Sequence, residues 1–124
     1  MSQSSTIITA RSRTNEIIDY LTASGENWDV LCAELAKLSI SEDLVLAELR
    51  ENPLRWRTAP LMPLLVAEDG DTLDVNEVQG ISEELNRICA SDLVETIQER
   101  RNFNRLTGLM SATARRGGMV FLRS

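Results

Sequence analysis

Arginine is the residue whose placement in this sequence points most directly to chemistry. Residues 100–124 carry six arginines and no acidic residue, a formal charge of +6, whereas residues 1–99 carry seven basic and nineteen acidic residues, a charge of −12. A guanidinium group binds a carboxylate or a phosphate through two parallel hydrogen bonds, which a lysine ammonium does not. Such a charge contrast within one chain indicates a partner.

The same segment has the spacing of an amphipathic helix. Over residues 100–116, at about 100° per residue, the five arginines fall within an arc of about 160°, and Phe103, Leu106, Met110 and Ala114 fall within a separate arc of about 80°. We expect this helix to be the partner-binding surface, formed by Arg100, Arg101, Phe103, Arg105, Leu106, Met110, Arg115 and Arg116. The partner it indicates is a protein with acidic groups. The phosphates of a nucleic acid and a merely solvated helix face are the alternatives.

Residue types that carry catalysis or bind metals are sparse. The chain has no histidine, which removes the commonest general base and the commonest metal ligand. Its two cysteines, Cys32 and Cys89, form no C-x-x-C motif and lie in apolar stretches typical of buried free thiols. Paired carboxylates occur, but nothing in the sequence places a pair in a cleft. We therefore expect no enzymatic activity, no catalytic residue, no cofactor, no metal and no small-molecule substrate.

Three short patterns resemble known sites but are not supported by their surroundings. Residues 69–74 begin like a calcium-binding loop, yet Leu73 stands where an oxygen ligand is needed and the glycine at position 6 is missing. Residues 57–63 match the R-x-x-P-x-x-P ligands of SH3 domains, but the apolar residues that follow indicate burial. A helix-turn-helix over residues 28–51 would present mainly carboxylates to DNA.

Apolar residues recur at helical spacing in several tracts. The spacing and the capping residues predict helices over residues 14–24, 28–38 and 42–51, and a helical tract over residues 74–116 that opens with a capping box. A single continuous helix is slightly favoured over two for this last tract. Its first half carries a seam that serves either a second copy of the chain or the monomer's own core. The seam consists of Val78, Ile81, Leu85 and Ile88.

These elements predict an all-α fold. We expect a single small helical-bundle domain of four to five helices, with a long C-terminal amphipathic helix and an irregular, proline-containing middle segment over residues 53–72. Residues 1–12 are expected to be a flexible N-terminal segment, residues 13–116 the helical domain, and residues 117–124 a C-terminal tail. Within that tail, residues 119–122 are expected to form a short strand or to dock as an apolar plug.

The function that these features predict is that of a non-enzymatic protein–protein interaction protein. It would be an adaptor, an assembly chaperone, an inhibitor or a structural subunit of a larger complex. Its partner would be another protein, itself, or both, with the homo-oligomer at even odds. The alternative is a nucleic-acid-binding module that uses the arginine-rich C-terminal helix, which the acidic remainder of the chain disfavours. No stretch approaches the roughly 20 apolar residues of a membrane span, so no membrane contact is expected and the expected location is cytoplasmic.

Overall fold

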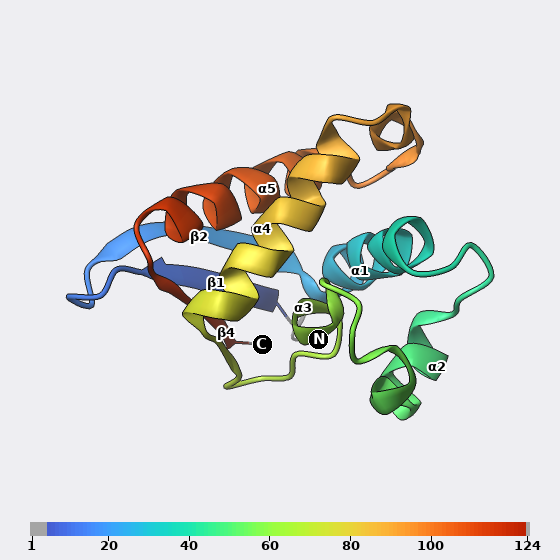
Figure 1. Ribbon diagram of the computed structural model, residues 1–124, viewed down its shortest axis with the longest axis horizontal. Helices are drawn as coiled ribbons and strands as arrows, with labels where there is room; N and C mark the ends of the chain where they lie inside the picture. Colours follow the sequence, from blue (N-terminus) through green and yellow to red (C-terminus); the bar gives the residue numbers. More distant parts are fainter. Residues whose placement is uncertain (1–4, 124) are drawn as a thin grey trace.

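A four-stranded antiparallel sheet organises the structure (Figure 1). In the computed structural model, which describes residues 5–123, the strands lie in the order β2-β1-β4-β3. The strands are β1 (Ser5–Arg11), β2 (Ile17–Ser24), β3 (Thr72–Leu73) and β4 (Met119–Arg123). Strands β1 and β4, from opposite ends of the described chain, pair at the centre of the sheet, and β2 and β3 form its edges.

The predicted all-α helical bundle is wrong, because the fold is α+β. Residues 14–24, expected to form the first helix, supply the end of a hairpin turn and all of β2. Along this strand Leu21 and Ala23 are buried whereas Tyr20 and Thr22 are exposed, which is the period of two that a strand requires. β-Branched and aromatic residues fit such a pleated, half-buried surface, and here they outweigh the helical spacing of three apolar residues.

Described residues of both expected terminal segments also belong to the sheet, whereas residues 1–4 and 124 lie outside the described residues. Residues 5–11, assigned above to a flexible segment, form β1, and residues 119–123, assigned to a tail, form β4. The strand alternative for residues 119–122 is therefore the one that the structure shows, and not an isolated plug. Pairing between β1 and β4 joins Ile7 to Arg123 and Arg11 to Met119.

Three helices and one 3-10 turn lie between β2 and β3. Helix α1 (Gly25–Ser39) contains the helix expected over residues 28–38, and Ser24 caps it by accepting a hydrogen bond from the Asn27 amide at 3.1 Å. The helix expected over residues 42–51 is shorter. The elements that follow α1 are α2 (Leu46–Glu51), η1 (Pro53–Trp56) and α3 (Met62–Leu65).

One continuous helix was slightly favoured over two for residues 74–116, and the structure divides this tract. Helix α4 (Val75–Cys89) and helix α5 (Arg100–Arg115) are separated by the 3-10 turn η2 (Asp92–Thr96). The expected capping box at Asp74 and Glu77 is confirmed, with both reciprocal hydrogen bonds present. At the other end of the tract, the glycines after α5 close it with two backbone hydrogen bonds, from Gly118 to Thr113 and from Gly117 to Ala114. Gly117 has the positive φ of 62° that this closure requires.

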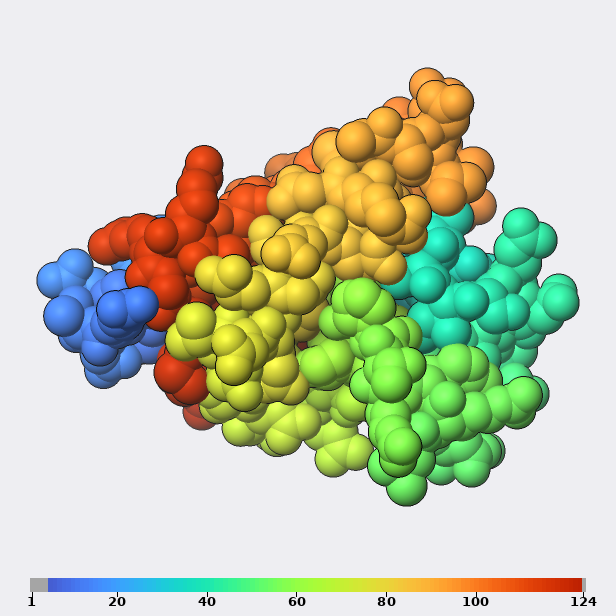
Figure 2. All heavy atoms as spheres, viewed as in Figure 1, coloured from blue at the N-terminus to red at the C-terminus, as the bar shows by residue number. Residues whose placement is uncertain are grey.

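Helices α4 and α5 cover one face of the sheet (Figure 1). Viewed from that side, the blue end of the β1–β2 hairpin projects clear of them (Figure 2). Three of the inward strand residues, Ile8, Ala10 and Val120, are small or aliphatic and fully buried. Glu84 on α4 ties this layer to the end of α1 by accepting a hydrogen bond from Ser39 Oγ at 2.7 Å and another from Arg87. Partial burial acts to raise the pKa of Glu84, but these two hydrogen bonds and the positive charge of Arg87 together outweigh it and lower the pKa.

Candidate interaction surface

The outer face of the sheet, opposite α4 and α5, carries an exposed apolar patch. Strand residues alternate between buried and outward-facing positions, most regularly along β4. Five of the nine large hydrophobic side chains that the described residues expose belong to this face. We call them the outer patch: Ile7, Ile17, Tyr20, Met119 and Phe121.

The strand register brings the members of the outer patch together. Tyr20 on β2 is opposite Thr9 on β1, and Thr9 is opposite Phe121 on β4, so one row crosses three strands. In a second row, Arg11 is opposite Ile17 on one side and Met119 on the other. Ile7 lies diagonally from both Tyr20 and Phe121, and diagonal neighbours in adjacent strands stand roughly 7–8 Å apart. The patch is therefore one surface of apolar side chains with Thr9 and Arg11 between them.

Two arginines and a depression border this surface. Arg11 and Arg123 face outward from β1 and β4, and no outward-facing residue of the four strands is acidic. Arg11 Nη1 donates a hydrogen bond to the Asn15 carbonyl at 3.0 Å, which holds the guanidinium at the hairpin end. A depression of about 340 Å³ lies there, lined by Met119 and Phe121 of the patch and by Arg11 and Arg13. It has the size and lining to take an apolar side chain next to a carboxylate.

The expected arginine surface is divided between the two ends of α5. Arg100, Arg101 and Arg105 lie in its first half, and Arg115 and Arg116 lie at its C-terminal end. All five are exposed. Arg105 Nη2 donates a hydrogen bond to the Tyr20 carbonyl at 2.9 Å, which places this arginine beside the edge of β2. The structure therefore brings Arg101 and Arg105 beside β2, whereas Arg100 Nη2 donates a hydrogen bond to the Glu95 carbonyl at 2.8 Å.

The apolar residues expected to accompany the arginines lie inside the protein. Phe103, Leu106 and Met110 are fully buried, as are the four residues of the expected oligomer seam. In this conformation none of these side chains has surface left for a partner or for a second copy. The seam residues, which are part of one chain's own hydrophobic core, are Val78, Ile81, Leu85 and Ile88.

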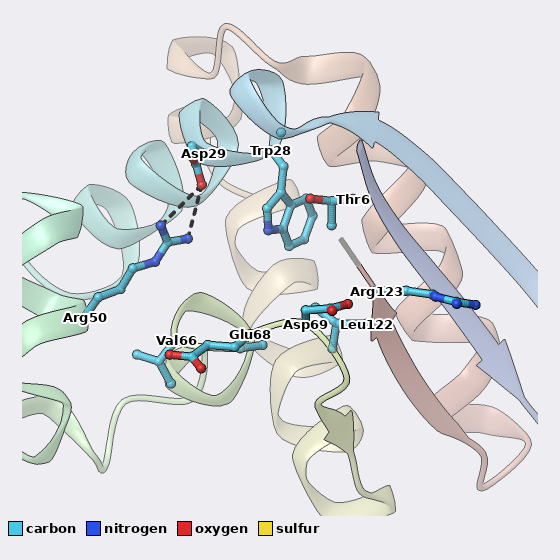
Figure 3. Close-up of a pocket in the computed structure, with 11 residues that line it drawn as sticks. Thr6, Trp28, Asp29, Arg50, Val66, Glu68, Asp69, Leu122 and Arg123 are labelled. Carbon is cyan, nitrogen blue, oxygen red and sulfur yellow. Dashed lines mark hydrogen bonds and ion pairs between the residues drawn. The ribbon is translucent and has the colours of Figure 1, made fainter. Parts of the chain in front are cut away.

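A second depression, of about 420 Å³, lies where α1, α2 and the segment before β3 meet the sheet (Figure 3). Trp28 and charged residues of both signs line it, and Arg50 spans one side. Arg50 Nη1 and Nη2 each lie 3.3 Å from Asp29 Oδ1, and its Nε donates to the Leu65 carbonyl at 3.2 Å. Arg50 thus joins α1, α2 and the end of α3, which is a structural role. Among residues 5–123 no group of His, Cys, Asp and Glu side chains is placed to hold a metal ion.

The two cysteines differ in environment. Cys32 is fully buried in α1, and burial raises the pKa of its thiol to about 12, with smaller opposing contributions from Arg50 and Asp29. Cys89, expected to be buried, is exposed at the end of α4. No disulfide joins them, and each is a free thiol.

This difference predicts selective alkylation. At pH 8, iodoacetamide should add one carboxamidomethyl group to the folded protein, at Cys89, because only an exposed thiolate reacts. Cys32 should react only after unfolding in denaturant. Mass spectrometry of the intact protein and its peptides measures both additions. In the control variant Cys89→Ser the folded protein should remain unmodified, and rapid modification of Cys32 there would contradict the burial seen in the structure.

The outer patch was not identified from the sequence. The sequence signal is weak, because residues 6–10 and 119–123 do not alternate between apolar and polar residues: Ile7 and Ile8 are adjacent, and residues 119–122 are all apolar. Of the helices formed by residues 5–123, none combines the length and the apolar character needed to cross a bilayer. The chain matches no family model, no curated protein and no solved structure in comparisons with known proteins.

Proposed function

We propose that this chain is a protein–protein interaction protein without enzymatic activity, and that the outer patch is its docking surface. The observation that carries the proposal is the concentration of exposed apolar side chains on one uncovered sheet face, next to a depression lined by arginines. Contiguous exposed apolar surface with a polar rim is typical of interaction sites. Aromatic and arginine side chains contribute most of the binding energy at such sites.

The charge of the face selects the kind of partner. Arg11 and Arg123 stand at its two ends without an outward-facing acid among the described strand residues, in a chain of net charge −6. A second copy would set the same arginines against each other, because a two-fold interface pairs a surface with itself. The partner we infer is therefore a different protein, with apolar side chains flanked by carboxylates. An adaptor, an assembly chaperone, an inhibitor or a structural subunit would use such a surface.

A protein fits the outer patch better than a nucleic acid does. Tyr20 and Phe121 would also suit stacking with the bases of a single-stranded nucleic acid. Ile7, Ile17 and Met119, however, offer such a ligand neither a stacking surface nor a phosphate contact, and they fit a protein.

The free thiols of the chain fit a reducing compartment, so we propose that this function is carried out in the cytoplasm.

Site-specific crosslinking tests the proposal. A photoreactive benzoylphenylalanine at position 121 should crosslink one acidic protein in the native host, because Phe121 lies at the centre of the patch and is 37% exposed. The same group at position 83, on the exposed side of α4, is the control and should not crosslink that protein. Crosslinks only to a second copy, only to nucleic acid, or to nothing would each overturn the proposal.

The purified partner then allows its affinity to be measured by calorimetry. Phe121→Thr should weaken binding by about 30-fold, the effect of losing a hot spot of about 2 kcal/mol. Threonine suits a strand, so the melting temperature should change little. Leu93→Ala removes an equally exposed side chain elsewhere and should leave the affinity unchanged. The double variant Arg11→Glu with Arg123→Glu should also weaken binding, and an unchanged affinity there would refute the charge argument.

A further inference from the structure

A groove runs along the free edge of β2, between this strand and α5, and Tyr20 is the one residue that it shares with the outer patch. Its volume is about 480 Å³, and five consecutive strand residues, 20–24, form one side of it. The other side comes from the first half of α5, through Arg101, Asn102 and Arg105, and Asn27 of α1 closes one end. Figure 1 shows α5 lying along β2, so the groove is elongated in the direction of the strand.

The edge of β2 is open to another strand. β2 is the first strand in the order β2-β1-β4-β3, and its register with β1 is regular from Asp19 to Ser24. It contains neither proline nor lysine, the residues that commonly block an edge. Alternate residues of an edge strand direct their backbone groups away from the sheet.

Two side chains form hydrogen bonds with the backbone groups of Tyr20. Its carbonyl accepts the hydrogen bond from Arg105 Nη2, and its amide donates to Asp19 Oδ1 at 2.7 Å. A guanidinium thus stands where the amide of an added strand would donate, and a carboxylate stands where its carbonyl would accept. Both side chains are about half exposed, 51% for Arg105 and 42% for Asp19, and their ion pair is long at 4.0 Å, so they can move aside.

The groove is positively charged at its α5 wall. Arg101 is exposed and forms no hydrogen bond or ion pair with any of residues 5–123. Glu99, the acid in the lining, accepts a hydrogen bond from Asn102 Nδ2 at 3.0 Å. The Arg101 guanidinium therefore remains for a ligand in the groove, and that of Arg105 becomes available when it leaves the Tyr20 carbonyl.

The spacing of these arginines matches an extended acidic peptide. Arg101 and Arg105 are four residues apart on a helix, a rise of about 6 Å. Side chains two residues apart on one face of a strand are separated by about 6.6 Å. An added strand with two acidic residues separated by one other residue would therefore place a carboxylate beside each guanidinium.

We propose that the β2 edge and the arginines of α5 bind an extended segment of another protein, with the pattern acid-any residue-acid, which adds to the sheet as a fifth strand. The backbone of the segment pairs with Tyr20 and Thr22. Its two carboxylates bind Arg101 and Arg105, and Arg105 leaves the Tyr20 carbonyl to the incoming amide. This strand addition combines backbone pairing for affinity with charge for selectivity.

A labelled synthetic peptide tests this binding by fluorescence anisotropy with the full-length protein. The probe is a short peptide of threonine and valine that contains two glutamates separated by one valine. We expect saturable binding, and we expect the amide of Thr22 to gain protection from hydrogen exchange. Glutamine in place of both glutamates should weaken binding by at least about tenfold, which corresponds to one charge-assisted contact. N-Methylation of the peptide amides that face β2 should abolish it.

Matched variants of the protein separate the groove from general attraction to arginine. Arg101→Glu with Arg105→Glu should weaken binding by at least about tenfold with the circular dichroism spectrum retained. Arg115→Glu with Arg116→Glu makes the same charge change at the other end of α5 and should have little effect. Phe121→Thr should also have little effect, since it tests the outer patch alone. Absence of saturable binding at about 1 mM, equal binding of the glutamine or N-methylated peptide, or equal loss in the two arginine pairs would each overturn the proposal.

Discussion

Leu85→Asp is expected to unfold the protein rather than to release a smaller folded species. Leu85 is fully buried in α4, at the centre of the seam that the sequence offered equally to a second copy or to the monomer's core. A carboxylate at this position loses its hydration without gaining a partner, and the cavity left by leucine adds to the destabilisation. We expect a loss of about 5 kcal/mol or more, which is comparable with the whole stability of a small domain.

Urea denaturation followed by circular dichroism measures this loss, together with size-exclusion chromatography at several concentrations. Asn76→Asp is the matched control, because it adds the same carboxylate to the exposed first turn of α4. A negative charge there is favourable to the helix dipole, so its stability should change by less than about 0.5 kcal/mol. A folded Leu85→Asp monomer derived from a wild-type dimer would contradict the burial of Leu85 within one chain.

Gly118→Ala is the second change with a large expected effect. A Cβ at Gly118 would lie 2.4 Å from the Arg11 carbonyl oxygen and 3.1 Å from both Ile18 Cδ1 and Thr113 Cγ2. The Arg11 oxygen belongs to the backbone of the central strand, so it cannot yield without parting β1 from β4. Overpacking of this kind destabilises by about 3 kcal/mol or more when a backbone atom is the obstacle.

Two other glycines provide the control. Gly80 in α4 and Gly108 in α5 have open space where a Cβ would lie. Alanine at either position should therefore raise the free energy of unfolding, by about 0.5–1 kcal/mol, because it favours the helical backbone. The same substitution thus has opposite signs at Gly118 and at the helical glycines, and thermal denaturation of the three variants checks this. A Gly118→Ala protein as stable as the wild type would show that β1 and β4 are farther apart than described.

The parts of α4 and α5 that were predicted correctly have local signals. The capping box at Asp74 and Glu77 brings together residues three apart, and the 3-4-3 spacing of the seam residues correctly marks one buried face of α4. The two glycines after α5 likewise mark its end within a few residues. Each of these features depends on neighbours in the sequence and on little else.

The sheet was not predictable for the opposite reason. β4 is five residues long, and what makes it a strand is its pairing with β1, more than 100 positions away. In β2, Ile17, Ile18 and Leu21 satisfy a helical spacing as well as a strand, so only the burial of Leu21 and Ala23 decides between them. The arginines of α5 were found by their charge, but their division between the β2 groove and the far end of the helix depends on where β2 lies.

The pairing of β1 with β4 also sets when the protein can fold during synthesis. The ribosome completes β1, β2 and the helices of residues 5–123 before it reaches residues 119–123, so the central strand β1 has one edge unpaired until those residues are translated. Closing a loop of this length before any stabilising contact forms is slow compared with the pairing of neighbouring elements. The nascent hairpin of β1 and β2 thus exposes both an apolar face and a strand edge until the last strand emerges, and during this interval the chain is most open to aggregation and to chaperones.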